Sequence, residues 1–329
     1  MTGITIHIGF SKTATTTLQR AVFESHSQIY YLGKIYKSQH PRQCITADTF
    51  DLLEPLLWKT GQPCDLEAKK KFFVETLIPR VDSNKIILGS WEDLGQQGAA
   101  IRAGIDPLMS FETSVNRLKA VCGQCIILMS LRNPITRLPS MYLQHLRGNQ
   151  KQLARNFITF EEWLDSEEAR LGGLKDVFQY REYAEVAMNV LGAENVGVFL
   201  YEEFDSDPEK YLQEVSDFLG IDAKETMDLT EGQRLHTRMF ASQVNQMSKI
   251  NSSFTGRLLW RFSSVDRKKK SIGFSDIHSV IQSTVDNDVP ASVEISPEIT
   301  QRISDAVRED NRWLVDNLHL ELEKYGYPL

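Results

Sequence analysis

The residues that follow the first predicted strand combine the parts of an anion-binding loop. Ile4–Gly9 alternates polar and β-branched residues, which predicts a strand, and the apolar spacing after Leu18 predicts a helix. The segment between them reads Phe10-Ser11-Lys12-Thr13-Ala14-Thr15-Thr16-Thr17. A helix N-terminus offers unpaired N–H groups and a partial positive charge, while small residues allow close backbone approach. With the threonine hydroxyls and the Lys12 charge added, we expect this loop to bind a phosphate-like group.

The spacing of this loop differs from that of the nucleotide-binding P-loop, G-x-x-x-x-G-K-[ST]. Counting from Gly9, the second glycine and the lysine would stand where the sequence has Ala14 and Thr15. Because Lys12 comes earlier than that lysine, ordinary use of ATP or GTP is disfavoured. The alternative for the segment is structural, with Lys12 as a solvated loop residue and the threonines as helix caps.

A second candidate anion site follows the apolar run Cys125–Leu131, which predicts a strand buried on both faces. Asn133-Pro134 suits the start of a helix, so Arg132 would stand at the carboxyl end of the strand, where open α/β sheets bind ligands. Its guanidinium can donate to two phosphate oxygens, and Ser140 adds a hydroxyl. Pro139 predicts either a kink or a later helix start. Taken alone, Arg132 is better explained as half of a surface ion pair.

Both segments resemble motifs of sulfotransferases that use 3′-phosphoadenosine 5′-phosphosulfate (PAPS). His7–Thr16 is similar to the 5′-phosphosulfate loop, H-I-G-x-x-K-T-G-T-T, with Ala14 in place of the usual glycine. A Cβ at position 14 is tolerated in helical backbone and unfavourable where φ is positive. Arg132–Tyr142 is similar to the 3′-phosphate site, R-N-P-x-x-R-x-x-S-x-Y. The resemblance implies that PAPS binds through Ser11, Lys12, Thr13, Ala14, Thr15, Thr16, Thr17, Arg132 and Ser140.

A later segment extends the resemblance to about residue 220. Val196–Phe204, followed by a helix that ends in F-L-G, is similar to the late strand and Y-E-D-L segment of the family. Glu202 and Glu203 are interpreted as helix-capping residues rather than substrate contacts. Farther along, Arg234, His236 and Arg238 either complete the 3′-phosphate pocket or form a plain surface loop.

Sulfuryl transfer also needs a group that takes the proton of the acceptor hydroxyl. The predicted strand Lys85–Leu88 leads into Gly89-Ser90-Trp91-Glu92, which resembles the family's strand followed by S-x-E, whose glutamate accepts the proton. The alternative is that Glu92 caps a following helix. Asp93 and His145 are further candidates for the base. His7 is expected in the core, with one hydrogen bond.

The resemblance implies in-line transfer of a sulfuryl group from PAPS to a hydroxyl, with Lys12 stabilising the leaving phosphate and Glu92 as general base. It implies no metal, because protein donors alone can hold the leaving group. The acceptor expected is a small molecule or a carbohydrate, glycolipids included. Two alternatives stay open: a P-loop-type kinase with a relocated lysine, and a non-catalytic nucleotide-binding protein of the same fold.

Strands that alternate with helices predict an α/β fold, in which a central parallel sheet has helices on both faces in a P-loop NTPase-like three-layer arrangement. The predicted strands are Ile4–Gly9, Ile29–Leu32, Lys85–Leu88, Cys125–Leu131 and Asn195–Tyr201. The predicted helices are Thr15–Ser25, Leu66–Val81, Phe111–Val121, Pro134–Leu146, Tyr180–Leu191, Pro208–Leu219 and Pro297–Leu322. We expect residues 1–329 to form a single domain, with a nucleotide-binding core over 1–220 and a mainly helical C-terminal part over 221–329 packed on it.

Composition restricts the class of protein further. With 41% hydrophobic and 25% charged residues and a net charge of −7, the chain is typical of a globular protein without a nucleic-acid surface or a polybasic membrane anchor. It has no apolar run of membrane-spanning length and no room for a signal peptide, so a cytoplasmic location is expected. The four cysteines, which include the Cys122-x-x-Cys125 pair, are expected to be free thiols. The oligomeric state is not indicated.

Overall fold

The structure, a computed structural model, describes residues 3–34, 47–57, 59–91, 106–148, 158–171, 173–232, 241–242, 244–245, 248, 289 and 291–329. Within these residues, a five-stranded parallel sheet has the strand order β2-β3-β1-β4-β5. The strands are β1 (Ile4–Gly9), β2 (Ile29–Lys34), β3 (Ile86–Ser90), β4 (Cys125–Leu131) and β5 (Val196–Leu200). The predicted parallel sheet is therefore confirmed.

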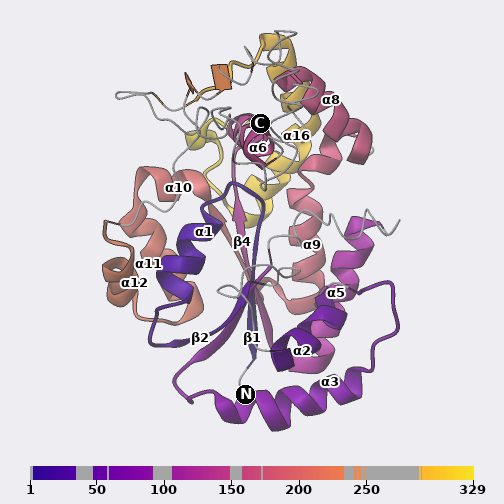
Figure 1. The fold of residues 1–329 in the computed structure, drawn as a ribbon, viewed down its shortest axis with the longest axis vertical. Coiled ribbons are helices and arrows are strands. Elements are labelled where there is room, and N and C mark those ends of the chain that lie inside the picture. The colour runs from indigo at the N-terminus through magenta and orange to yellow at the C-terminus, as the bar shows by residue number, and fades with distance from the viewer. Residues whose placement is uncertain are drawn as a thin grey trace, which may run out of the picture. The chain divides into compact units, whose positions relative to one another are not determined.

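Helices alternate with the strands along the chain. They are α1 (Thr15–Thr17), α2 (Ala47–Leu57), α3 (Leu66–Phe72), α5 (Pro107–Cys122), α6 (Pro134–Gly148), α8 (Phe160–Leu171), α9 (Tyr180–Leu191), α10 (Tyr201–Ser206), α11 (Pro208–Leu219), α12 (Ala223–Thr230) and α16 (Pro297–Leu318). α1, α11 and α12 lie on one side of the sheet, and α2, α5 and α9 on the other (Figure 1). None of the helices in the described part of the chain has the length and apolar character that crossing a bilayer requires.

Two predicted helix ends were wrong for identifiable reasons. α5 begins at Pro107 rather than at residue 111, because the Asp106 carboxylate accepts a hydrogen bond from Met109 N at 2.8 Å and caps the helix. α16 ends at Leu318, before the predicted end at residue 322. His319 follows with φ of 55°, a left-handed conformation that stops a helix.

The regions predicted as Thr15–Ser25 and Leu66–Val81 are not continuous α-helices. In the first, α1 is followed by a π-helical turn over Leu18–Phe23. In the second, α3 is followed by a π-helical turn and then a 3₁₀ turn. Side-chain periodicity does not distinguish these variants, because each is only one or two turns long.

Proline is accommodated inside two helices. α6 begins at Pro134 and continues through Pro139, so the later helix start that the sequence left open does not occur. α2, which the sequence analysis missed, contains Pro55. Each of these prolines removes one intrahelical hydrogen bond, and the helix continues past it in both cases.

The chain forms two compact units. The first unit holds the sheet and comprises Met1–Pro134, Lys175–Leu235 and Ser304–Leu329; the second comprises Ile135–Leu174 and His236–Ile303. The last residues of the chain thus belong with the sheet. The single domain over residues 1–329, with a core that ends near residue 220, stays a prediction.

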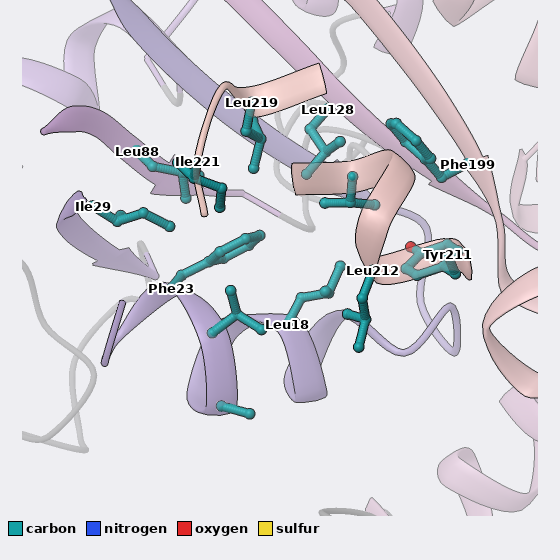
Figure 2. Close-up of a cluster of buried hydrophobic side chains, with 13 residues drawn as sticks. Leu18, Phe23, Ile29, Leu88, Leu128, Phe199, Tyr211, Leu212, Leu219 and Ile221 are labelled. Carbon is teal, nitrogen blue, oxygen red and sulfur yellow. The ribbon is translucent and has the colours of Figure 1, made fainter. Parts of the chain in front are cut away.

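A buried apolar cluster in the first unit anchors the helical turn that follows the loop. Leu18 and Phe23 of the π-helical turn pack in one cluster with Leu128 of β4 and with Leu212 and Leu219 of α11 (Figure 2). Complete burial of such a side chain contributes about 1.5–3 kcal/mol. The start of the helix, and with it the loop before it, is therefore held against the sheet.

His7 is completely buried in β1, which confirms that it is a core residue. Its Nδ1 lies 3.2 Å from Ser90 Oγ on β3, and its Nε2 lies 3.3 Å from Ser130 Oγ on β4. The imidazole thus has two hydroxyl partners rather than the one that was predicted. It links the three central strands just before the loop begins.

Candidate functional site

The loop between β1 and α1 has a backbone shape suited to an anion. Thr13 Oγ1 donates to Phe10 O at 2.6 Å, and Phe10 N donates to Ser130 O at 3.4 Å. Lys12 and Ala14 have φ of 73° and 58°. Left-handed residues in such loops turn successive N–H groups toward one point, which makes a concavity for anions. The geometry supports the predicted anion-binding loop.

Gly9 is required by a close approach of the helix to the strand. A Cβ at this position would lie 1.9 Å from Cγ2 of Thr15, the first residue of α1 and itself buried. Any side chain at position 9 would displace the first helical turn. Glycine therefore lets the N–H groups of that turn lie directly at the end of β1.

The backbone of Ala14 has a positive φ, the conformation in which a Cβ is unfavourable. Its φ of 58° is left-handed, which costs an L-residue about 1–2 kcal/mol. Ala14→Gly removes this strain but adds backbone entropy to the unfolded chain, a cost of about 0.5–1 kcal/mol. We expect the free energy of unfolding to rise by about 0.5–1 kcal/mol in a urea titration.

The matched control for this change is Ala21→Gly. Ala21 is buried in the π-helical turn, where loss of the methyl group should lower the free energy of unfolding. If Ala14→Gly were as destabilising as Ala21→Gly, position 14 would not be strained.

Arg132 lies immediately after β4, as predicted, and its side chain reaches the loop. Arg132 Nη1 donates to the carbonyl oxygen of Lys12 at 3.0 Å, although the two residues are 120 positions apart. The guanidinium carbon lies 4.3 Å from the centre of the Tyr201 ring, and the residue is 7% exposed. The two predicted phosphate anchors therefore meet at one edge of the sheet.

The backbone around Arg132 is held by three further side chains. Tyr180 Oη donates to Arg132 O at 2.9 Å. Asn133 N donates to Glu202 Oε1 at 3.0 Å, and Tyr327 Oη donates to Glu202 Oε2 at 2.9 Å. Burial raises the pKa of Glu202 above its ordinary value, while these donors and the charge of Arg132 oppose that rise.

The two glutamates after β5 act as caps, which confirms their interpretation from sequence. Glu202 accepts from Asn133, the residue before the first residue of α6. Glu203 Oε2 accepts from Leu200 N at 3.4 Å, at the start of α10. Both carboxylates thus satisfy backbone N–H groups at helix starts.

Ser140 and His145 belong to the second unit. Ser140 is half-buried in α6. Since Arg132 belongs to the first unit, binding of one phosphate by Arg132 and Ser140 together stays a prediction.

His145, a further candidate for the base, packs near Trp163 with 6.3 Å between ring centres, and burial lowers its pKa. Tyr142 is buried against the same Trp163.

The candidate bases Glu92 and Asp93 lie outside the described residues, as do Arg234, His236 and Arg238. Trp91 is the last described residue after β3. It is buried, and its backbone N donates to His7 O at 2.8 Å. β3 therefore ends at the same edge of the sheet as the start of the loop.

Cys64, Cys122 and Cys125 are free thiols, as predicted. Burial raises the pKa of Cys125 to about 12 and raises that of Cys122 well above its ordinary value. Because the thiolate is the reactive and metal-binding form, this pair is not suited to redox or metal chemistry. Over the residues that the structure describes, no group of three or more metal-ligating side chains was found.

A family model described as the sulfotransferase domain matches residues 106–280, more than half of the chain. The chain belongs to the sulfotransferase family. The matched residues of this sulfotransferase include β4, Arg132 and Ser140, whereas the loop after β1 lies outside them. Family membership assigns the transfer of sulfuryl groups and confirms the P-loop-like α/β fold. A comparison with curated proteins found no match.

Several solved structures resemble this sulfotransferase at low identity. A sulfotransferase from Alicyclobacillus acidocaldarius is 20% identical over 79% of this chain and 99% of its own, with a TM-score of 0.44. Mouse sulfotransferase SULT7A1, in complex with PAP, is 13% identical over 94% and 85%, with a TM-score of 0.38. A sulfotransferase domain from the curacin biosynthetic pathway is 14% identical over 71% and 80%, also with 0.38. At these TM-scores the likeness carries no argument about this chain.

Proposed function

We propose that this sulfotransferase transfers a sulfuryl group from PAPS to the hydroxyl of an acceptor. The supporting observation is the hydrogen bond from Arg132 to the carbonyl of Lys12, which joins the 5′-phosphosulfate loop to the 3′-phosphate arginine. PAPS carries anionic groups at two positions of one ribose. A single nucleotide fits two adjacent anion anchors better than two separate anions would.

The donors gathered here fit an anionic bisphosphate. The loop offers backbone N–H groups, the hydroxyls of Ser11 and Thr15–Thr17 and the ammonium of Lys12 for the 5′ end. The Thr13 hydroxyl donates to Phe10 O, so Thr13 contributes its backbone N–H only. Arg132 is assigned to the 3′-phosphate, with Ser140 as an additional donor. Such donors act by position and charge, as in phosphoryl transfer.

The roles of the protein groups follow from the charges that change during transfer. PAPS supplies the activated sulfuryl group and a bisphosphate leaving group. Lys12 and the first N–H groups of α1 stabilise the negative charge that grows on the leaving phosphate oxygen. Glu92 accepts the proton of the acceptor hydroxyl as the oxygen becomes a nucleophile.

Glu92→Gln tests the assignment of the base. A general base contributes about 10²–10⁴-fold to rate, so kcat should fall at least about 100-fold while the affinity for adenosine 3′,5′-bisphosphate stays within about twofold. Asp93→Asn is the matched control and should retain most of the activity. Near-normal turnover in Glu92→Gln, with loss in Asp93→Asn, would assign the base to Asp93 instead.

The function itself is tested with PAPS labelled in its sulfuryl group and a panel of hydroxylated acceptors, including sugars, glycolipids and phenols. We expect label to move to at least one acceptor. Magnesium-dependent turnover of ATP instead would favour the kinase alternative. Binding of adenosine 3′,5′-bisphosphate without transfer to any acceptor would favour a non-catalytic binding protein. A carbohydrate acceptor and a cytoplasmic location stay predictions from the sequence.

A further inference from the structure

The last residues of the chain are hydrogen-bonded to the segment that carries Arg132. Tyr327 Oη donates to Glu202 Oε2 at 2.9 Å, and the other oxygen of this carboxylate accepts from Asn133 N at 3.0 Å. Asn133 Nδ2 donates to Tyr325 O at 3.0 Å. The C-terminal segment therefore reaches Asn133 by two routes, one through Glu202 and one directly.

These contacts bear on Arg132 because Asn133 is the next residue. The carbonyl of Arg132 accepts from Tyr180, and the N–H of the same peptide group donates to Glu202, so both sides of this group are held. The Arg132 guanidinium is oriented by the Lys12 carbonyl and the Tyr201 ring. Movement of the peptide group would shift the guanidinium relative to the loop.

The two groups at the ends of the route through Glu202 lie away from solvent, while Glu202 itself is half-buried. Tyr327 is 4% exposed and Asn133 is 3% exposed. Burial holds the pKa of Tyr327 well above its ordinary value, so its hydroxyl remains a donor. Without that donor, one oxygen of the half-buried Glu202 carboxylate would lose a partner, which is costly for a partly desolvated charged group. Glu202 would then be expected to shift and to take Asn133 N with it.

We propose that the C-terminal segment Tyr325–Tyr327 positions Arg132 for the 3′-phosphate, with Tyr327 acting as a positioning residue through Glu202 and Asn133. The inference rests on the proposed function, because it assigns Arg132 to the 3′-phosphate of the nucleotide. The proposal implies that Tyr325–Tyr327 raises the affinity for a 3′,5′-bisphosphate. The affinity for a nucleotide without a 3′-phosphate should not depend on this segment.

Tyr327→Phe removes one hydroxyl and tests the proposal by calorimetric titration with two nucleotides. We expect affinity for adenosine 3′,5′-bisphosphate to fall about tenfold, the size of effect typical for a hydrogen bond to a charged group. Affinity for AMP, which lacks the 3′-phosphate, should stay within about twofold. Tyr30→Phe, the same change on the edge strand β2, should leave both affinities unchanged.

A second variant keeps the test decisive if Tyr327→Phe fails to fold. Asn133→Ser keeps a helix-capping side chain but removes the donor to Tyr325 O, and the same selective loss is expected. Wild-type selectivity in these variants, or an equal loss for both nucleotides, would overturn the positioning role alone. No preference for the bisphosphate in the wild-type protein would overturn the proposed function as well.

Discussion

Lys12→Ala should reduce sulfuryl transfer by about 1,000-fold while the fold survives. One oriented donor at a developing oxyanion contributes about 10²–10³-fold, and Lys12 adds a full charge to the loop. The substitution removes the ammonium and keeps the backbone carbonyl that accepts from Arg132. Initial rates with labelled PAPS measure the loss, and circular dichroism with a thermal melt verifies the fold.

Two further variants show whether this effect is specific to Lys12. Lys12→Arg retains the positive charge and should recover part of the activity, since guanidinium and ammonium differ in geometry. Lys59→Ala removes a cation that pairs with Glu54 on the surface and should leave the rate unchanged. A rate in Lys12→Ala within about threefold of wild type would remove Lys12 from the mechanism.

Arg132→Met should weaken binding of adenosine 3′,5′-bisphosphate by about 100-fold. The guanidinium is assigned to the 3′-phosphate, and a charge-assisted pair contributes about 1.5–3 kcal/mol. A smaller loss is expected for AMP, because the variant also removes the hydrogen bond to Lys12 O that supports the 5′-phosphosulfate loop. The affinity of Arg132→Lys for the bisphosphate should lie between that of the wild type and that of Arg132→Met. Lysine keeps the charge but lacks the planar guanidinium and its stacking on Tyr201.

The control for this prediction is Arg302→Met. Arg302 pairs with Asp165 and Glu168 on the surface of the second unit, so its loss should not change the affinity for either nucleotide. An Arg132→Met variant whose affinity for the bisphosphate equals that of Arg302→Met would contradict the assignment of Arg132.

Strands and helices were predictable from sequence where the local residue pattern matches the burial of the element in the fold. The bounds of β1 and β4 were predicted correctly, because β1 alternates polar and β-branched residues and β4 is an apolar run of strand length. α11 was also predicted with its bounds, since Pro208 opens it and Gly220 closes it. α2 was missed because Pro55 contradicts a helical pattern.

The candidate site was predictable only in its contiguous motifs. The loop around Lys12 and the position of Arg132 follow from residues adjacent in sequence. The hydrogen bonds of Tyr180 to Arg132 and of Tyr327 to Glu202 span 48 and 125 positions, and no local pattern indicates such partners. Tyr201 belongs to the segment that is similar to Y-E-D-L. Its stacking on Arg132, however, depends on how β4 and β5 pair.

The most direct test of the account is a calorimetric titration of the wild-type protein with adenosine 3′,5′-bisphosphate, ATP and AMP. If the loop and Arg132 together bind one nucleotide at both its phosphate positions, the bisphosphate should bind about 50-fold more tightly than AMP, as expected for a charge-assisted contact to the added phosphate. ATP should not exceed AMP by more than about threefold, because the loop lacks the P-loop lysine position. A preference for the bisphosphate of about twofold or less would contradict the account, since Arg132 would then not recognise the 3′-phosphate.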